Sequence, residues 1–339
     1  MAERTEIAWC DSTFNPWQGC TKVSPGCDNC YAEARQDTRL HAVKWGAGQP
    51  RKRTKTWGDP VKWNKAHAEF FAAHGRRQRV FCASLADVFD NEVPDEWRID
   101  LFDLIHDTPR LDWLLLTKRI GNVKKMLPSN TSNDDATDFA RLWPNVWLGA
   151  TIVNQQEADR DIPKLLATPA AVRFLSMEPL LGRVDLRQWI GLECRHESGY
   201  MEADTGATVC RECDEAALID WVIVGGESGT KARPMHPDWA RSLRDQCKAA
   251  GVPLLFKQWG EWLPWTQFCD SGIDDPPEQT RFDTREWNGE TWGDVGRPMW
   301  CDSKDGLIDD MQCVGRVGKK AAGRLLDGVT HDGYPEAVL

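Results

Sequence analysis

Short apolar runs alternate with stretches of helical periodicity along most of the chain, and no other feature of the sequence constrains the fold as strongly. Near-continuous apolar runs are typical of strands that are buried on both faces, as in parallel sheets. Strands that alternate with helices form right-handed βα units. The sequence therefore predicts an α/β fold, with strands at residues 14–20, 80–85, 112–118, 145–152, 172–179, 220–228 and 252–260.

Helices are predicted between several of these strands. Residues 95–106 have apolar side chains at helical spacing, and residues 158–166 and 237–250 follow the same pattern. Gly251 is expected to end the last of these helices. About seven such units fit a full or partial (β/α) TIM-type barrel, and a doubly wound open sheet is the alternative.

Two segments interrupt or follow the barrel pattern. Residues 1–260 form the predicted barrel domain, within which residues 184–216 are a small insertion that contains a group of cysteines. Residues 261–339 are rich in Gly, Asp and Trp, which predicts a loop-rich C-terminal extension.

Polar residues stand at the carboxyl ends of the predicted strands. In a barrel and in a doubly wound sheet alike, the active site lies at that end of the sheet. The residues concerned are Ser84, Asp87, Thr117, Lys118, Thr151, Asn154, Glu178, Glu227, Ser228, Lys257 and Gln258.

Three cysteines follow the first predicted strand, at Cys20, Cys27 and Cys30, with Pro25 and Gly26 supplying a bend between them. Soft thiolate ligands favour iron–sulfur clusters and zinc. Three protein ligands leave one iron of a [4Fe–4S] cluster open, and we favour that cluster here. A structural zinc site is the alternative, and it would need a fourth ligand such as Cys10 or His41.

Over roughly residues 5–260 the chain resembles a family of phage and prophage proteins that is defined by a three-cysteine motif and described as radical SAM-like, of unknown function. The resemblance rests on FNPWQGC, SPGCDNCYAE, SLADVFD, LLLTKR, LGATI, FLSMEPLLG, DWVIVGGESG, ARPMHPDW and LLFKQWG. It implies a TIM-barrel-like fold and a [4Fe–4S] cluster on Cys20, Cys27 and Cys30. In radical SAM enzymes the open iron is chelated by S-adenosylmethionine (SAM).

The sequence departs from the common radical SAM pattern C-x3-C-x2-C. The first gap has six residues, and Asn29 stands where an aromatic residue usually precedes the last cysteine. The Gly-Gly-Glu stretch that usually contacts SAM near the second strand is found here on a late strand, as Gly225, Gly226 and Glu227.

Specific roles are expected for the residues at the strand ends. Glu178 is expected to bind the SAM ribose or to act on the substrate, and a hydrogen bond to a neighbouring loop is the alternative. Lys118, next to Arg119, is expected to meet a carboxylate or phosphate unless the two form a plain surface pair. The candidate catalytic residues are thus Glu178, Lys118 and Lys257, and the candidate cofactor-binding residues are Ser84, Thr117, Gly225, Gly226, Glu227 and Gln258.

A second group of potential ligands lies in the insertion. Cys194 and His196 form one pair, and Cys210 and Cys213 form another. Two such pairs indicate tetrahedral zinc, and the 13 residues between them suit a short hairpin. An unmetallated loop is the alternative. We therefore predict a zinc knuckle that stabilises an insertion too small for its own core.

Composition bears on the partners and the location of the protein. The net charge of −10 argues against a surface built for duplex DNA. The run Arg51, Lys52, Arg53 and Lys55, with Trp57 beside it, favours a nucleotide or nucleic-acid base as substrate, and a solvated face is the alternative. The sequence has no secretory signal and no apolar run of about 18 residues, so we expect a cytoplasmic protein without a membrane partner.

These observations lead to one functional hypothesis and two rivals. We expect a radical SAM-like iron–sulfur enzyme that receives electrons from a donor such as flavodoxin or ferredoxin. The first rival is a structural iron–sulfur or zinc protein that binds nucleic acid without radical chemistry. The second is a zinc-dependent nucleic-acid enzyme.

Overall fold

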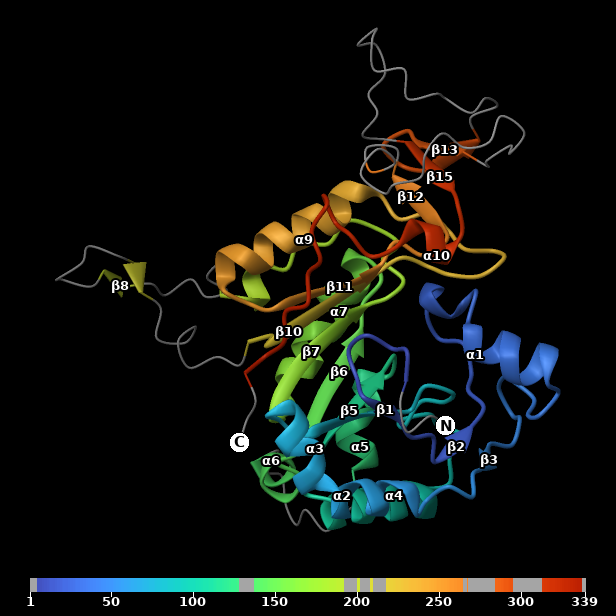
Figure 1. Cartoon of the computed structure of the whole chain (residues 1–339), viewed down its shortest axis with the longest axis vertical. Coiled ribbons are helices and arrows are strands. Elements are labelled where there is room, and N and C mark those ends of the chain that lie inside the picture. Colours follow the sequence, from blue (N-terminus) through green and yellow to red (C-terminus); the bar gives the residue numbers. More distant parts are fainter. Residues whose placement is uncertain are drawn as a thin grey trace, which may run out of the picture.

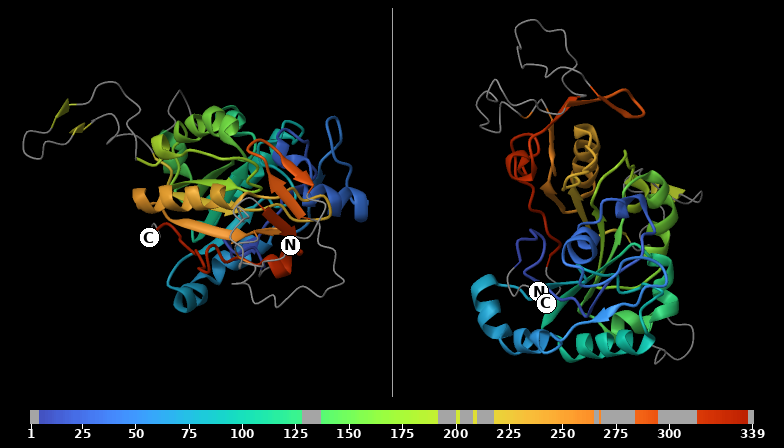
Figure 2. Two further views of the ribbon diagram at one scale, coloured as in Figure 1. Left: turned by 90° about the horizontal axis from the view of Figure 1, so that it is seen from above. Right: turned by 90° about the vertical axis from the view of Figure 1, so that its right-hand side faces the viewer.

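The centre of the fold is a seven-stranded parallel sheet that curls into a half-barrel (Figures 1 and 2). The computed structural model describes residues 5–127, 137–191, 200–201, 208–209, 218–264, 267, 284–294 and 313–336. The sheet strands are β1 (Ser12–Thr13), β4 (Gln78–Cys82), β5 (Leu111–Thr117), β6 (Val146–Thr151), β7 (Val172–Met177), β10 (Trp221–Gly225) and β11 (Leu254–Gln258).

The strands stand side by side in the order in which they occur in the chain. A doubly wound sheet requires a point at which the strand order reverses, and this sheet has none. The prediction of a partial β/α barrel is therefore confirmed, and the alternative of a doubly wound sheet is wrong.

Helices follow most of the strands. The predicted segments appear as α4 (Asp95–Asp107), α7 (Gln155–Leu166) and α9 (Pro237–Ala250). Gly251 ends α9 with a φ of 70°, a left-handed conformation that glycine adopts without strain. The other helices within the described residues are η1 (Pro25–Cys27), α1 (Tyr31–Glu33), η2 (Ala34–Arg39), α2 (Asp59–Lys65), α3 (His67–His74), η3 (Ile120–Asn122), α5 (Val123–Met126), α6 (Thr137–Leu142), η4 (Arg187–Trp189) and α10 (Lys319–Ala322).

The sheet has two differently packed faces, because successive side chains of a strand point to opposite sides. One face packs against the helices and forms the larger apolar core. The inner face of the half-barrel carries a second core, which the N-terminal segment covers with Trp9 and Cys10. The strand residues of this inner core are Phe81, Leu114, Trp147, Val172, Phe174, Trp221, Ile223 and Leu255.

The first strand differs from the prediction. Residues 14–20 do not form one strand, since β1 ends at Thr13 and β2 (Trp17–Gln18) leaves the main sheet to pair with β3 (Lys52–Arg53). Pro16 lies between them and has no N–H to donate to a ladder. The chain is instead held by Asn15, whose Oδ1 accepts a hydrogen bond from the backbone N–H of Leu85 at 2.7 Å.

The described residues of the predicted loop-rich C-terminal extension contain a small antiparallel sheet. Its strands are β12 (Trp262–Pro264), β13 (Thr284–Trp287), β14 (Trp292–Asp294) and β15 (Cys313–Arg316). Trp287 and Trp292 pack against Trp239 of α9, with ring centroids 5.2 Å and 6.5 Å from it. These aromatic contacts dock the small sheet onto the barrel.

The last described residues cover the free edge of the half-barrel. The backbone N–H of Phe256 donates to His331 O at 2.9 Å, and Trp221 Nε1 donates to Gly333 O at 2.8 Å. The Tyr334 hydroxyl donates to Ala8 O at 2.6 Å. The segment thus connects β11 with the N-terminal segment that covers the inner face of the sheet.

Two further sequence predictions concern the insertion and membranes. Within the insertion, β8 (Tyr200–Met201) and β9 (Thr208–Val209) pair antiparallel. The predicted zinc ligands Cys194, His196, Cys210 and Cys213 lie outside the described residues. In the ranges given above, we find no helix with the length and apolar character that crossing a membrane requires.

Candidate functional site

The three cysteines lie on a loop that begins after β2 and ends at α1. Two tight turns shape its second half. Ser24 caps η1 by accepting a hydrogen bond from Gly26 N at 3.0 Å, and Cys30 N donates to Cys27 O at 3.3 Å. Cys27 is buried, whereas Cys20 and Cys30 are partly exposed. We call residues 20–30 the cysteine loop.

The cysteine loop rests directly on the carboxyl ends of the strands. A Cβ atom on Gly26 would lie 2.8 Å from Val153 Cγ1 and 3.5 Å from Lys118 Cε, so only glycine fits there without a shift. Behind the last cysteine, the Tyr31 hydroxyl donates to the backbone carbonyl of Ser84 at the end of β4. The loop is therefore packed against β4, β5 and β6 rather than extended into solvent.

Glu227 anchors the loop on its other side. Its Oε2 accepts a hydrogen bond from Asn29 Nδ2 at 3.0 Å and another from Arg233 Nε at 2.9 Å. Arg233 also donates to Pro25 O at 2.8 Å and pairs with Asp28 at 3.0 Å. Burial works to raise the pKa of Glu227, but these hydrogen bonds outweigh burial and lower that pKa. An ionised Glu227 thus joins the cysteine loop to the end of β10.

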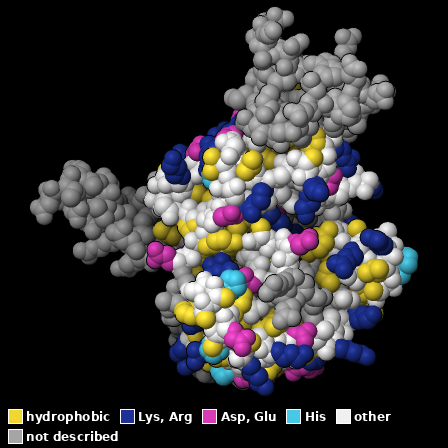
Figure 3. All heavy atoms as spheres, in the orientation of Figure 1, with side chains coloured by type: hydrophobic (Ala, Val, Ile, Leu, Met, Phe, Trp, Pro, Cys, Tyr) yellow, Lys and Arg dark blue, Asp and Glu magenta, His cyan; other side chains and the backbone are white. Residues whose placement is uncertain are grey.

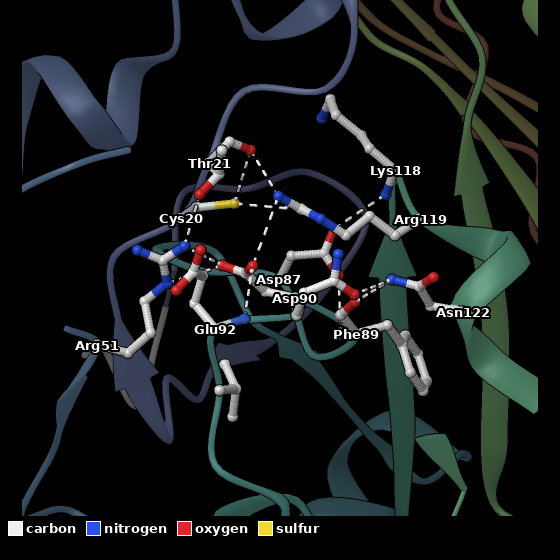
Figure 4. Close-up of polar contacts among 12 residues, drawn as sticks. Cys20, Thr21, Arg51, Asp87, Phe89, Asp90, Glu92, Lys118, Arg119 and Asn122 are labelled. Atoms are coloured by element: carbon white, nitrogen blue, oxygen red, sulfur yellow. Dashed lines mark hydrogen bonds and ion pairs between the residues drawn. The ribbon is translucent and has the colours of Figure 1, made fainter. Parts of the chain in front are cut away.

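Cys20 lies beside a buried charge network (Figure 4). Arg119 Nη1 donates to Cys20 Sγ at 3.4 Å and to Asp87 Oδ2 at 3.1 Å, and Arg119 Nη2 donates to Thr21 O at 2.6 Å. Burial raises the pKa of the Cys20 thiol to about 12; Asp87 adds to this increase and Arg119 opposes it. Arg119 is therefore not part of a plain surface pair, because it meets carboxylates in the interior.

The basic run 51–55 separates into buried and exposed members. The Arg51 side chain is 0% exposed and pairs with Asp90 at 2.7 Å, so it does not belong to a solvated face. Arg53 lies over the ring of Trp57 at 4.2 Å and pairs with Asp100 at 2.6 Å. One face of Trp57 is thus covered, which argues against the stacking role expected for it. Lys52 and Lys55 remain exposed.

The three candidate catalytic residues share the inner face of the half-barrel at its carboxyl end. Lys118 Nζ lies 3.3 Å from Thr151 Oγ1. Glu178 follows β7 and forms an ion pair with Lys257 of β11 across the intervening strand β10. Glu178 Oε1 is buried and has no hydrogen-bond partner in the described structure. Gly225 lies under this carboxylate, because a Cβ there would be 3.3 Å from Glu178 Cγ.

Other candidate residues are used for internal contacts. Thr117 is buried and donates to Asp87 Oδ1 at 2.7 Å, and Gln258 Nε2 donates to Gly226 O at 3.2 Å. A Cβ on Gly226 would lie 1.9 Å from Trp259 O, so this glycine permits the close approach of β10 and β11. Ser84 Oγ accepts a hydrogen bond from Asn15 Nδ2 at 3.0 Å.

Several residues at the site were missed by the sequence analysis. Asn29, Tyr31 and Arg233 fix the cysteine loop, and Asp90 completes the buried charge network. Arg233 and Asp90 stand in or beside the stretches ARPMHPDW and SLADVFD. A charged residue within an otherwise apolar motif indicates that its side chain is paired with an opposite charge in the fold, and this signal was present in both motifs.

The donor set suits an iron–sulfur cluster in its chemistry, although the structure does not bring the three thiols together as ligands of one metal ion. Three thiols stand within one loop at the carboxyl ends of the sheet strands, with a guanidinium beside the first. Among the described residues, no three His, Cys, Asp or Glu side chains are gathered closely enough to hold a metal ion. Cys10, a suggested fourth zinc ligand, packs into the inner core, and His41 is exposed.

Comparisons with known proteins identify a family but no function. The family described as "Protein of unknown function (DUF5131)" matches residues 4–335. The search of curated proteins and the search of solved structures found no match.

Proposed function

The chain belongs to the DUF5131 family of proteins of unknown function, and on that premise we propose that it is an iron–sulfur enzyme of the radical SAM type. Cys20, Cys27 and Cys30 would hold a [4Fe–4S] cluster. One observation carries the proposal: a loop with three thiols is packed over the carboxyl ends of the half-barrel strands, where Lys118, Glu178 and Lys257 share the inner face.

A [4Fe–4S] cluster on three cysteines has one iron that no cysteine binds, and SAM is chemically suited to chelate that iron. A reduced cluster held by Cys20, Cys27 and Cys30 would supply the electron for cleavage of SAM to methionine and a 5′-deoxyadenosyl radical. The protein must then bind the nucleoside part and exclude water. Glu178 Oε1 is a buried acceptor without a partner in the described structure, and such an acceptor suits a ribose hydroxyl.

Lys257 and Lys118 would serve this site as fixed cations. Lys257 keeps Glu178 in place through their ion pair, and Lys118 stands under the cysteine loop next to Gly26. Glu227 is already engaged by Arg233 and Asn29, so we assign SAM recognition to Glu178 and loop anchoring to Glu227.

The proposed chemistry also requires a one-electron donor. Without the buried Arg51, residues 20–55 contain seven Lys or Arg against three Asp or Glu, a net charge of +4, whereas the whole chain carries −10. Cationic and hydrophobic side chains gather over α1 and η2, on the right of Figure 3. Such a surface complements an acidic flavodoxin or ferredoxin. A nucleotide or nucleic-acid base remains the proposed substrate, based on the exposed Lys52 and Lys55.

The test is SAM cleavage by the anaerobically reconstituted protein. After reduction with dithionite and addition of SAM, 5′-deoxyadenosine should form in the wild type and be absent in Cys27→Ala. Glu178→Gln should lower its formation at least about tenfold, since a buried hydrogen bond to a charged acceptor contributes about 1.5–3 kcal/mol. Glu69→Gln, on the exposed surface of α3, is the matched control and should behave like the wild type.

The outcome also separates the rival functions. A loaded cluster whose spectrum does not respond to SAM, with no 5′-deoxyadenosine, would favour a structural iron–sulfur protein. A colourless protein that contains zinc in place of iron would favour a zinc protein.

A further inference from the structure

Arg119 connects Cys20 with two buried carboxylates that follow β4, Asp87 and Asp90. Besides its bonds to Cys20 Sγ, Asp87 and Thr21 O, its Nη2 lies 3.8 Å from Asp90 Oδ1. The side chain is only 6% exposed. Figure 4 shows the guanidinium lying between Cys20 and Thr21 on one side and Asp87 and Asp90 on the other. A planar guanidinium that is held at both ends has a fixed orientation.

The two carboxylates that hold Arg119 are themselves fixed. Asp87 Oδ1 accepts from Thr117 Oγ1 at 2.7 Å and from Phe89 N at 2.9 Å, and Asp87 Oδ2 accepts from Lys118 N at 3.0 Å. Asp90 is paired with the buried Arg51. Arg51 also donates to Thr21 Oγ1 at 2.7 Å, so both arginines contact the residue that follows Cys20.

The three cysteines differ in the hydrogen bonds that their sulfur atoms accept. Cys20 Sγ accepts a hydrogen bond from a buried guanidinium, and no Arg or Lys in the described part of the chain donates to Cys27 or Cys30. A hydrogen bond from a cation stabilises negative charge on the acceptor sulfur. Hydrogen bonds to the sulfurs are one of the factors that set the reduction potential of an iron–sulfur cluster.

We propose that Arg119 is a positioning residue that holds the Cys20 sulfur and raises the reduction potential of the cluster bound there. The inference rests on the cluster of the proposed function but not on SAM cleavage. Reduction adds one electron to the cluster, and the guanidinium stabilises the added charge through the Cys20 sulfur. Without Arg119, the carboxylates of Asp87 and Asp90 would face that sulfur with no cation between them, and reduction would become harder.

The experiment is a redox titration of reconstituted full-length variants, monitored by electron paramagnetic resonance. Arg119→Gln should shift the midpoint potential to more negative values, and Arg119→Lys, which keeps the charge but not the planar fork, should shift it less. Arg53→Gln is the matched control. It removes one positive charge from an arginine that binds Trp57 and Asp100, and it should leave the potential unchanged.

Iron content separates this inference from the proposed function. Each variant should first be shown to hold about four irons per chain, as a three-cysteine [4Fe–4S] site requires. Equal potentials in loaded wild type and Arg119→Gln would overturn the role of Arg119 and leave the cluster standing. If Arg119→Gln does not fold, the same comparison is made with Arg119→Lys, and equal potentials in the loaded wild type and this variant would overturn the role of Arg119. A wild type without iron would overturn both proposals, whereas absence of SAM cleavage would overturn only the enzyme chemistry.

Discussion

Asn29 donates a hydrogen bond from Nδ2 to Glu227 Oε2 at 3.0 Å, and this contact joins two residues 198 positions apart in the chain. Asn29 lies between two of the candidate cluster ligands, and Glu227 follows β10. The position of the cysteine loop over the half-barrel therefore depends on a strand that is formed much later in the sequence. This arrangement suggests that the late strand end controls how firmly the loop is held.

Glu227→Ala should loosen the cysteine loop. The variant leaves the partly buried Arg233 without its main carboxylate partner, so we expect unfolding to become easier by about 1–3 kcal/mol. Bound iron should also be lost to a chelator several-fold faster than from the wild type. Chemical denaturation and the rate of bleaching measure the two effects, and unchanged bleaching would show that the anchor is unimportant for the loop.

Replacement of Cys20, Cys27 and Cys30 by alanine should abolish iron binding. The wild type is expected to contain about four irons per chain and to be brown, and the triple variant should be colourless. Cys247→Ala is a suitable control, because this cysteine is buried in α9 and should not affect iron. Full iron content in the triple variant would refute the assignment.

Zinc should bind independently of the first three cysteines. We predict one zinc per chain on Cys194, His196, Cys210 and Cys213, retained in the triple alanine variant and lost in Cys210→Ser. Since metal binding in such a small insertion contributes to its folding, Cys210→Ser should also become more sensitive to proteolysis there. Metal analysis of purified protein is the measurement, and a wild type free of zinc would contradict the prediction.

Asp90→Asn should destabilise the protein strongly. The Asp90 and Arg51 side chains are 2% and 0% exposed, and removal of one member of a buried ion pair costs about 3–5 kcal/mol. Asp59→Asn, which breaks the exposed pair with Lys62, should cost less than about 1 kcal/mol. Urea denaturation of both variants compares the two costs, and equal losses would mean that burial of the first pair has no energetic effect.

Asp112 should make stability depend on pH. Burial raises the pKa of this carboxyl from its ordinary value near 3.8 to about 6, with Arg77 opposing the shift. The folded protein therefore binds more protons than the unfolded chain between about pH 4 and pH 6. The contribution of this group is full at low pH and is lost as the pH rises through 6, by about 2–3 kcal/mol in total.

The measurement is the difference in unfolding free energy between wild type and Asp112→Asn. The wild type should lose stability relative to the variant between pH 4 and pH 7, because asparagine does not ionise. A difference that stays constant over this range would show that the Asp112 carboxylate ionises without a penalty.

Most strands were predictable because their signal is local. The runs around Leu114, Leu148 and Val222 are apolar on both faces, and parallel strands inside a β/α barrel need that pattern. The first strand was misplaced because its pairing is not local. Apolar and aromatic residues continue through Trp17, but Pro16 and the contact between Asn15 and Leu85 end the main-sheet pairing at Thr13.

The candidate site was predictable only in part. The rule that active sites lie at the carboxyl ends of strands led us to expect Lys118, Glu178 and Lys257 at one end of the sheet, and the structure brings them there on the inner face. The rule alone does not say that Thr117 and Gln258, which alternate with them along the same strands, point to the other face and make internal contacts. That distinction required the observed strand boundaries and register.

By itself the sequence determined the parallel α/β architecture and the placement of three cysteines within one short loop, because hydrophobic periodicity and residue spacing are properties of neighbouring residues. Only the tertiary structure decided which charges are buried and which strand ends meet the loop. Arg51 and Lys52 look alike in the sequence, yet Arg51 is buried against Asp90 and Lys52 is exposed. The free energy of a buried charge depends on a partner that the fold brings in from elsewhere in the chain, and no local pattern contains that partner.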